Sequence, residues 1–364
     1  MQRFLTLSFV LALAVATAAS PVPEGPAEDD APSLVSRVFA EREPVIRVTQ
    51  VSDTEPVVEN AAGRVAAAEA LIELLEPEER AELLLSVDDP ERSKWTNVPP
   101  RMDDEGLRLG DLDEEEIGAV QDLLATALSH SGYERTRDIM LADDRLLPPG
   151  GSRPGFGAEN FWLVLFGEPD AKGAWGLQLD GHHLALNLSF SGEGMTMSPT
   201  FLGAQPSRFE RGDEVVEPLG DAVSGAFALI GSLDDTQRAT AVVGPTRAGN
   251  VAAAGRDGFV PEREGLACSE LSADQMRLAQ ALFTAVVRDL PQDIAQKRLR
   301  ELENELPEMH LSWRGPTSPK SDVSFRLQGP TLILEYACQD LGGDPLDHLH
   351  LMYRDPTNEY GARL

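Results

Sequence analysis

Cysteine is scarce in this chain. Two cysteines, Cys268 and Cys338, occur among 364 residues, and no CxxC pair is present. The absence of that pair excludes a thioredoxin-type redox motif and a zinc knuckle. In an oxidising compartment the two thiols could form one disulfide, which would stabilise the fold by roughly 4 kcal/mol in the chain-entropy model. Two buried free thiols are the alternative, and the sequence leaves both open.

Positive charge is the second deficit. Lysine and arginine number 31 against 61 aspartates and glutamates, which gives a formal net charge of −30. A surface this negative repels phosphate backbones and anionic lipids, so it excludes nucleic acid and membrane surfaces as favoured partners. We expect a small-molecule substrate or ligand instead. The composition says nothing about the oligomeric state.

Several familiar catalytic motifs are also missing. The sequence contains no GxGxxG after a predicted strand, no Walker loop, no HExxH and no GxSxG. Their absence argues against Rossmann oxidoreductases, P-loop nucleotide hydrolases, zincin proteases and α/β-hydrolases.

Long apolar runs are absent after the first twenty residues. Arg3 is followed by an apolar stretch from Phe4 to Val15 and then by Ala16-Thr17-Ala18. This order is typical of a signal peptide, and we predict one over residues 1–19, with export to the periplasm or the extracellular space. An uncleaved anchor is the alternative, but the run is short for a membrane span. The mature chain is expected to lie off the membrane.

The remaining chain divides by composition and periodicity. Residues 20–58 are rich in Pro, Glu and Asp and are expected to form an acidic arm. Residues 59–364 are expected to form one α+β domain, in which the late strands complete the earlier sheet and helices pack on one side. No internal repeat of 20–50 residues is visible. Within this domain the pattern predicts helices over 59–150, strands over 155–204, helices over 219–305 and strands over 308–364.

One acidic stretch looks at first like a metal-binding loop. It runs from Asp111 to Glu116, but it lacks the alternating oxygen ligands and the mid-loop glycine of a calcium site. Acidic residues also stabilise the first turn of a helix, because they offset the positive end of the helix dipole. We therefore predict a helix over 117–128 that these residues cap.

Histidines provide the strongest chemical signal. His348 and His350 lie two apart on a predicted strand, so both rings should face the same side, about 7 Å apart at Cβ. A second pair, His182 and His183, follows Gly181. Strict strand alternation would let only one of these two face the same target, and His183 is favoured because its face is the more polar.

Three neutral imidazoles suit Zn, Cu, Fe or Ni and leave a coordination position open. The alternative is that these histidines are structural and hydrogen-bonded at strand ends. His310 is a possible further member of the site. His130 is interpreted as a helix C-terminal residue that interacts with the helix dipole.

Two charged residues follow His348 and His350 in the sequence. Asp355 could orient a ligating imidazole, and Arg354 could hold a carboxylate or phosphate through two hydrogen bonds. A buried structural Arg354–Asp355 pair is the alternative.

Several stretches of the sequence stand out together: Phe161–Gly167, Trp175–Asn187, Thr200–Gly203, Leu327–Pro330 and His348–Asn358. Taken together, they resemble the DUF3500 family of uncharacterised proteins. The likeness extends over most of the mature chain. Its most specific parts are the GHH block at residues 181–183 and the HxH…RDP block at residues 348–356. The family often has Asn before the first His of HxH, where this chain has Asp347. The resemblance implies no activity, because the family has none assigned.

The sequence therefore predicts an exported, metal-dependent enzyme, either a hydrolase or an oxidoreductase. Its metal ligands would be His348, His350 and His183 or His182, with Asp355 and Arg354 as supporting residues. One rival is a metal-free binding protein that uses the same polar cluster and Trp175. Another is a metal-free hydrolase with a histidine as general base.

Overall fold

The computed structural model describes residues 32–47, 61–99, 105–149, 151–340 and 343–364. The predicted signal peptide and most of the expected acidic arm lie outside these residues. None of the helices in the described part combines the length and the apolar character that a membrane crossing requires.

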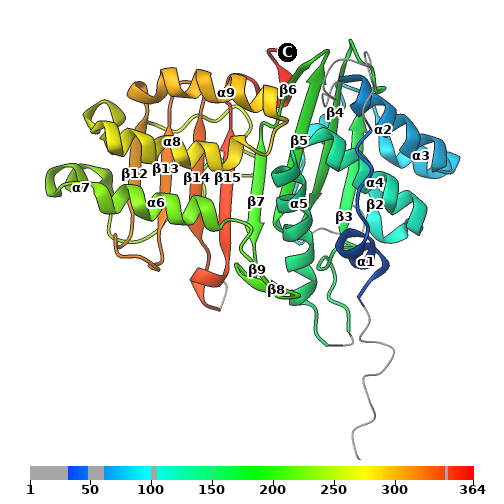
Figure 1. Ribbon diagram of the computed structural model, residues 1–364, viewed down its shortest axis with the longest axis horizontal. Coiled ribbons are helices and arrows are strands. Elements are labelled where there is room, and N and C mark those ends of the chain that lie inside the picture. The colour runs from blue at the N-terminus through cyan, green and yellow to red at the C-terminus, as the bar shows by residue number, and fades with distance from the viewer. Residues whose placement is uncertain (1–31, 48–60, 100–104, 150, 341–342) are drawn as a thin grey trace, which may run out of the picture.

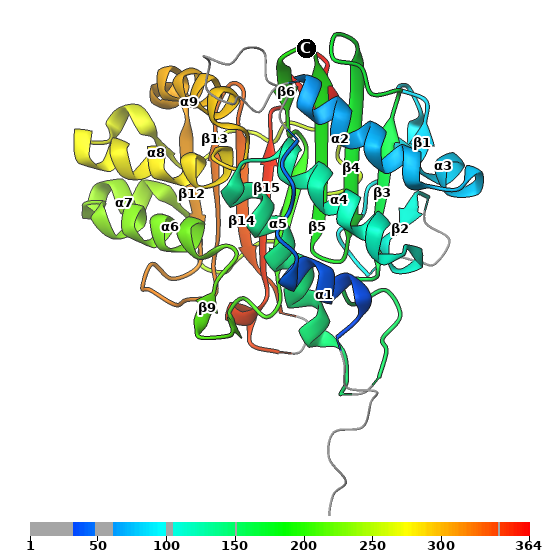
Figure 2. The ribbon, with the colours of Figure 1, turned by 45° about the vertical axis from the view of Figure 1, so that its right-hand side comes forward.

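Helices lie over one face of a large sheet, as predicted (Figures 1 and 2). The described helices are α1 (Leu34–Glu41), α2 (Ala61–Leu74), α3 (Pro77–Leu83), α4 (Glu114–Ala127), α5 (His130–Asp143), α6 (Gly220–Ser232), α7 (Asp235–Ala241), α8 (Ala273–Val287) and α9 (Gln292–Glu305).

The sheet order within the described residues is β1-β3-β4-β5-β7-β15-β14-β13-β12-β10; in addition β2 pairs with β3, β6 with β5 and β11 with β12, and β8–β9 form a separate hairpin. The strands are β1 (Leu84–Leu85), β2 (Leu107–Arg108), β3 (Phe161–Phe166), β4 (Ala174–Gly181), β5 (Leu184–Ser191), β6 (Gly194–Thr196), β7 (Thr200–Ala204), β8 (Phe209–Arg211), β9 (Glu214–Val216), β10 (Val242–Gly244), β11 (Leu266–Ala267), β12 (His310–Arg314), β13 (Ser324–Gln328), β14 (Ile333–Cys338) and β15 (Leu349–Arg354).

The late strands complete the early sheet, which confirms the predicted α+β class. The junction is the antiparallel pair β7–β15, where Leu351 lies opposite Leu202. Both leucines belong to the main apolar core. Their strand neighbours Met352 and Phe201 belong to a second cluster with Trp95. Because successive strand residues face opposite ways, these two clusters lie on opposite faces of the sheet.

The fold is internally duplicated. In the first half, α2 and α3 lead to the edge strand β1, the pair α4–α5 follows, and the antiparallel meander β3-β4-β5-β7 ends at the junction. In the second half, α6 and α7 lead to the edge strand β10, the pair α8–α9 follows, and the meander β12-β13-β14-β15 ends at the junction. The edge strands pair in parallel with the first meander strand in both halves, as β1 with β3 and as β10 with β12. The strand order is therefore the same when it is counted from either end of the sheet.

Sequence features recur at equivalent places in the two halves. Capping boxes begin both α4, through Asp113 and Glu116, and α8, through Ser272 and Gln275. The first of these confirms that the acidic stretch caps a helix. Gly265 precedes β11 with φ +88°, where a Cβ would lie 2.1 Å from the Leu311 carbonyl oxygen. Its counterpart Gly106 also has a positive φ. These residues serve the common fold.

The structure differs from the sequence interpretation at two helices. Residues 34–41, inside the expected arm, form α1, whose Val35, Val38 and Phe39 are buried in the core. His130 is the first residue of α5, after the N-cap Ser129, so the predicted C-terminal capping role is wrong.

Both cysteines are buried free thiols. Cys268 lies just before α8 and Cys338 ends β14. Burial raises the pKa of Cys268 to about 12, which keeps its thiol protonated and unreactive at neutral pH. Of the two alternatives that the sequence left open, the structure contains the free thiols.

Candidate metal centre

His182 and His183 form the two-residue turn between β4 and β5, here called the histidine turn. Gly181 and Leu184 are the last paired residues on either side of it. His183 has φ +69°, a left-handed conformation that histidine adopts more readily than bulky or branched residues. The strand alternation that we expected at this point is wrong, because both residues lie in the turn and not in a strand.

His348 and His350 approach the histidine turn from the far half of the sequence. His348 is extended and immediately precedes β15, while His350 lies in β15 between Ala337 and Gly203 on the neighbouring strands. Their Nε2 atoms are 3.0 Å apart. The spacing of two along an extended chain thus brings the two rings to one side of the sheet, as expected.

The structure joins these two rings to His183. The Nε2 atom of His183 lies 2.7 Å from that of His348. The ligand atoms of His183, His348 and His350, here called the three-histidine cluster, all lie within 4.8 Å of one another. Gly203 makes this approach possible, since a Cβ there would lie 2.9 Å from the Cδ2 of His183.

Burial keeps the three imidazoles neutral. It holds the pKa of His183 well below its usual range, with the neighbouring histidines adding to the effect. Burial likewise lowers the pKa of His348 to about 4, with His182 and Arg247 adding to the effect. It lowers the pKa of His350 to about 3, with His348 and His182 adding to the effect. A neutral imidazole has one ring nitrogen with a free lone pair, which is the form that binds metals.

The spacing of the cluster is close to that of a metal centre. Three nitrogens bound tetrahedrally at about 2.0–2.1 Å from zinc would lie roughly 3.3 Å apart. The two observed Nε2 separations, 2.7 and 3.0 Å, are shorter by only a few tenths of an ångström. With all three ligand atoms within 4.8 Å of one another, the cluster has the size that a single ion requires.

His182 is held by a carboxylate that the sequence interpretation missed. Its Nδ1 lies 2.5 Å from Oδ1 of Asp143, the last residue of α5, and Oδ2 of Asp143 accepts a hydrogen bond from the Gly157 amide at 2.6 Å. Asp143 is 1% exposed. The His182 ring also stacks on His183, with 3.7 Å between the ring centroids.

A scan against family models matched residues 58–362 to the family described as a protein of unknown function, DUF3500. The chain belongs to the DUF3500 family. The comparisons with curated proteins and with solved structures gave no match. All four histidines of the site, together with Asp143, lie inside the matched range.

Arg354 and Asp355 do not reach the histidines of this DUF3500 protein. They lie at the opposite end of β15, four and five residues and therefore roughly 13 and 16 Å from His350. Arg354 is fully buried and pairs with Glu359. Asp355 accepts hydrogen bonds from Thr357 and pairs with Arg298 at 3.3 Å. Their predicted roles as anion anchor and imidazole-orienting group are replaced by structural ion pairs with other partners.

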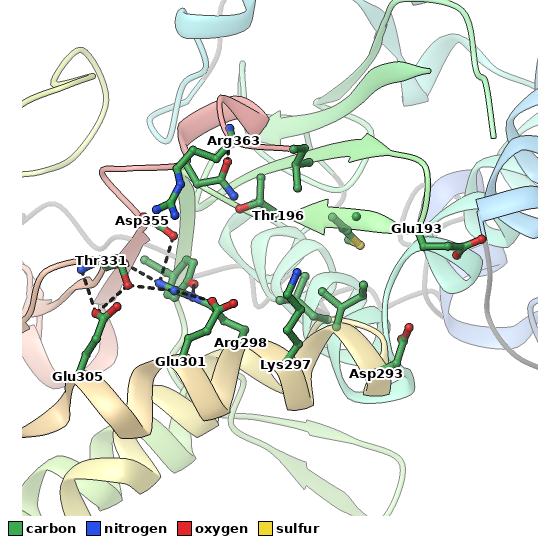
Figure 3. Close-up of a pocket in the computed structure, with 17 residues that line it drawn as sticks. Glu193, Thr196, Asp293, Lys297, Arg298, Glu301, Glu305, Thr331, Asp355 and Arg363 are labelled. Carbon is green, nitrogen blue, oxygen red and sulfur yellow. Dashed lines mark hydrogen bonds and ion pairs between the residues drawn. The ribbon is translucent and has the colours of Figure 1, made fainter. Parts of the chain in front are cut away.

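The end of β15 that carries Asp355 opens into the polar cavity of Figure 3, with a volume of about 610 Å³. Arg298 crosses one wall of it and contacts the Tyr353 hydroxyl and Thr331. The cavity and the three-histidine cluster are thus associated with opposite ends of β15.

His310 and Trp175, which the sequence also suggested for the site, lie away from the three-histidine cluster. His310 is in β12, three strands from β15 and so roughly 14 Å away across the sheet. Trp175 is buried against Phe190 in the main core. Neither can contribute to the site.

Proposed function

We propose that this DUF3500 protein binds one transition-metal ion through Nε2 of His183, His348 and His350 and performs metal-dependent chemistry on a small substrate. The observation that carries the proposal is the convergence of three neutral imidazoles, two of them buried and that of His350 half-buried, from two distant parts of the chain. Zinc, copper, iron and nickel all suit such a donor set.

Hydrogen bonding alone satisfies this convergence poorly. The Nε2 atom of His348 faces two other Nε2 atoms, at 2.7 and 3.0 Å. A neutral imidazole nitrogen has either one proton or one lone pair, so it cannot form a good hydrogen bond with both neighbours. A single cation would bind all three lone pairs at once.

The residues present suit a catalytic ion more than a closed structural site. Three protein ligands leave a fourth position for water or substrate, and a metal ion there would polarise a bound carbonyl or phosphoryl group or lower the pKa of water. An open-shell metal would support redox chemistry instead. The half-buried His350 is the most accessible of the three ligands.

A metal-free hydrolase is the second candidate. It is favoured by the pair formed by Asp143 and His182, because a carboxylate that accepts a hydrogen bond from Nδ1–H leaves the lone pair of Nε2 on the same ring free to act as a base. A ligand-binding protein is less favoured, since Trp175 is not available for recognition.

Export to the periplasm or the extracellular space remains part of the proposal. It is supported by the order of charged, apolar and small residues at the start of the chain. The strong negative charge supports a small-molecule partner over nucleic acid or anionic lipid.

Elemental analysis tests the metal site. The mature protein would be purified without a histidine tag beside a His348→Ala/His350→Ala variant and a His130→Ala control, whose side chain is exposed and away from the cluster. We expect about one equivalent of metal in the parent and in the control, and none in the folded double variant.

A parent protein that holds no metal, even after reconstitution with Zn, Cu, Fe and Ni in turn, would refute the proposal. The Asp143–His182 pair would then be tested by turnover of esters, phosphates and glycosides.

A further inference from the structure

Each half of the duplicated fold places an acidic residue at the end of one helix, against the equivalent hairpin turn. In the first half, Asp143 ends α5 and contacts His182 in the turn between β4 and β5. In the second half, Glu305 ends α9 and contacts Thr331 in the turn between β13 and β14, as Figure 3 shows.

The two contacts are equivalent by topology. Helices α5 and α9 each have 14 residues and each lead to the first strand of a meander. The two turns join the second and third strands of those meanders. The contact between the acid and the turn is therefore a feature of the common fold.

The chemistry of the two contacts differs. Glu305 accepts from the backbone amide of Thr331 at 3.1 Å and from its hydroxyl at 2.8 Å, so it secures the turn itself. Asp143 contacts an imidazole instead, and the amide of His183 donates to the Asn97 carbonyl oxygen at 3.3 Å. In the first half the acid thus orients a ring that stacks on a ligand of the proposed site.

We propose that Asp143 is a positioning residue of the metal centre. Its carboxylate holds His182 with a proton on Nδ1, and the His182 ring fixes the plane in which Nε2 of His183 points toward His348 and His350. This inference rests on the proposed three-histidine metal site.

A second metal ion between Asp143, His182 and His183 is the less suitable explanation, although their ligand atoms are close. The rings of His182 and His183 lie face to face, with only 30° between their planes. Their in-plane lone pairs therefore point in nearly parallel planes and do not converge on one ion. Both oxygens of Asp143 already have partners.

The test uses Co²⁺ as a probe, because its absorption spectrum reports coordination geometry. Asp143→Ala would be compared with Asp143→Asn and with Glu305→Ala, the equivalent change in the other half. We expect Asp143→Ala to weaken Co²⁺ binding about 10–100-fold and to change the spectrum. Asp143→Asn keeps an oxygen for Nδ1–H but places an NH2 group against the Gly157 amide, so it should restore the spectrum and part of the affinity. Glu305→Ala should affect only stability.

Failure of the positioning role and failure of the metal site would give different results. A parent that binds Co²⁺ and an Asp143→Ala variant with the same affinity and spectrum would overturn the positioning role and leave the metal site intact. A parent that binds neither Co²⁺ nor any of Zn, Cu, Fe and Ni would overturn both. If Asp143→Ala does not fold, His182→Gln replaces it, since the glutamine amide can still donate to Asp143 but removes the stacked ring. An unchanged spectrum in that variant would also overturn the inference.

Discussion

At the scale of single residues, two backbone features aim His183 at its neighbours. The left-handed conformation of His183 turns its side chain away from the path of β5. Gly203, on β7, presents no side chain to the imidazole, and its amide donates to the His183 carbonyl oxygen at 2.6 Å. The imidazole of His183 therefore packs directly against the backbone of Gly203. Its position depends on the absence of a Cβ atom at residue 203.

Gly203→Ala should displace His183. The added Cβ would lie 2.9 Å from Cδ2 and 3.0 Å from Cβ of His183, both closer than normal contact. We expect a loss of about 1–3 kcal/mol in the free energy of unfolding, as for other overpacked interiors, and weaker metal binding. Urea unfolding and metal titration measure the two effects.

Gly231→Ala is the matched control, because nothing lies within 4 Å of the Cβ it would add in α6. It should leave metal binding unchanged and stabilise the helix by about 0.5–1 kcal/mol. Equal metal affinity in the two variants would contradict the packing argument for Gly203.

At the scale of elements, a buried ion pair joins α5 to the second half of the fold. Arg135 in α5 donates to Asp289, between α8 and α9, at 2.5 Å and to the Pro218 carbonyl oxygen at 3.0 Å. Both charged side chains are buried. Since α5 also ends in Asp143, this contact fixes the helix that carries the proposed positioning residue.

Arg135→Ala should be strongly destabilising, by about 3–5 kcal/mol, because it leaves the carboxyl group of Asp289 buried without its partner. Arg135→Met/Asp289→Leu should recover much of that loss, since no charge is then buried. Chemical unfolding followed by circular dichroism measures both variants.

The exposed pair of Arg277 and Asp274 serves for comparison. Arg277→Ala should cost less than about 1 kcal/mol, because solvent screens that pair. A similar cost for Arg135→Ala would mean that the buried pair does not hold the two halves together.

At the scale of the whole molecule, two nearly symmetric halves share one sheet and one continuous core. The main apolar cluster contains residues from both halves, such as Leu202 and Leu351 at the junction. The histidines break this symmetry, because the turn equivalent to the histidine turn contains Thr331 and no histidine. The histidines of the candidate site are thus a difference between two otherwise similar halves.

The net charge of −30 should make stability depend on salt. Raising the ionic strength from about 0.01 M to about 1 M shortens the Debye length from roughly 30 Å to roughly 3 Å, which screens repulsion between the acidic side chains. We expect the Tm to rise with NaCl, as followed by thermal unfolding. KCl should act equally at the same ionic strength, and a Tm that stays constant or falls would contradict the expectation.

The sequence by itself determined the family, the α+β class and the two histidine pairs. These are local properties: strand and helix periodicity, acidic residues at the start of α4, and the spacing of two between His348 and His350. The same local reasoning placed His182 and His183 in a strand, because a two-residue turn without Asn or Gly carries little turn signal.

Only the tertiary structure decided which side chains meet. His183 and His348 are 165 residues apart in the chain, and Asp143 and His182 are 39 apart. Local patterns contain no information on such contacts, since these depend on how β7 pairs with β15 and on where α5 ends. For the same reason Asp355, close to His350 in sequence, lies at the far end of its strand, and Asp143 takes the place beside the imidazoles that we had predicted for Asp355.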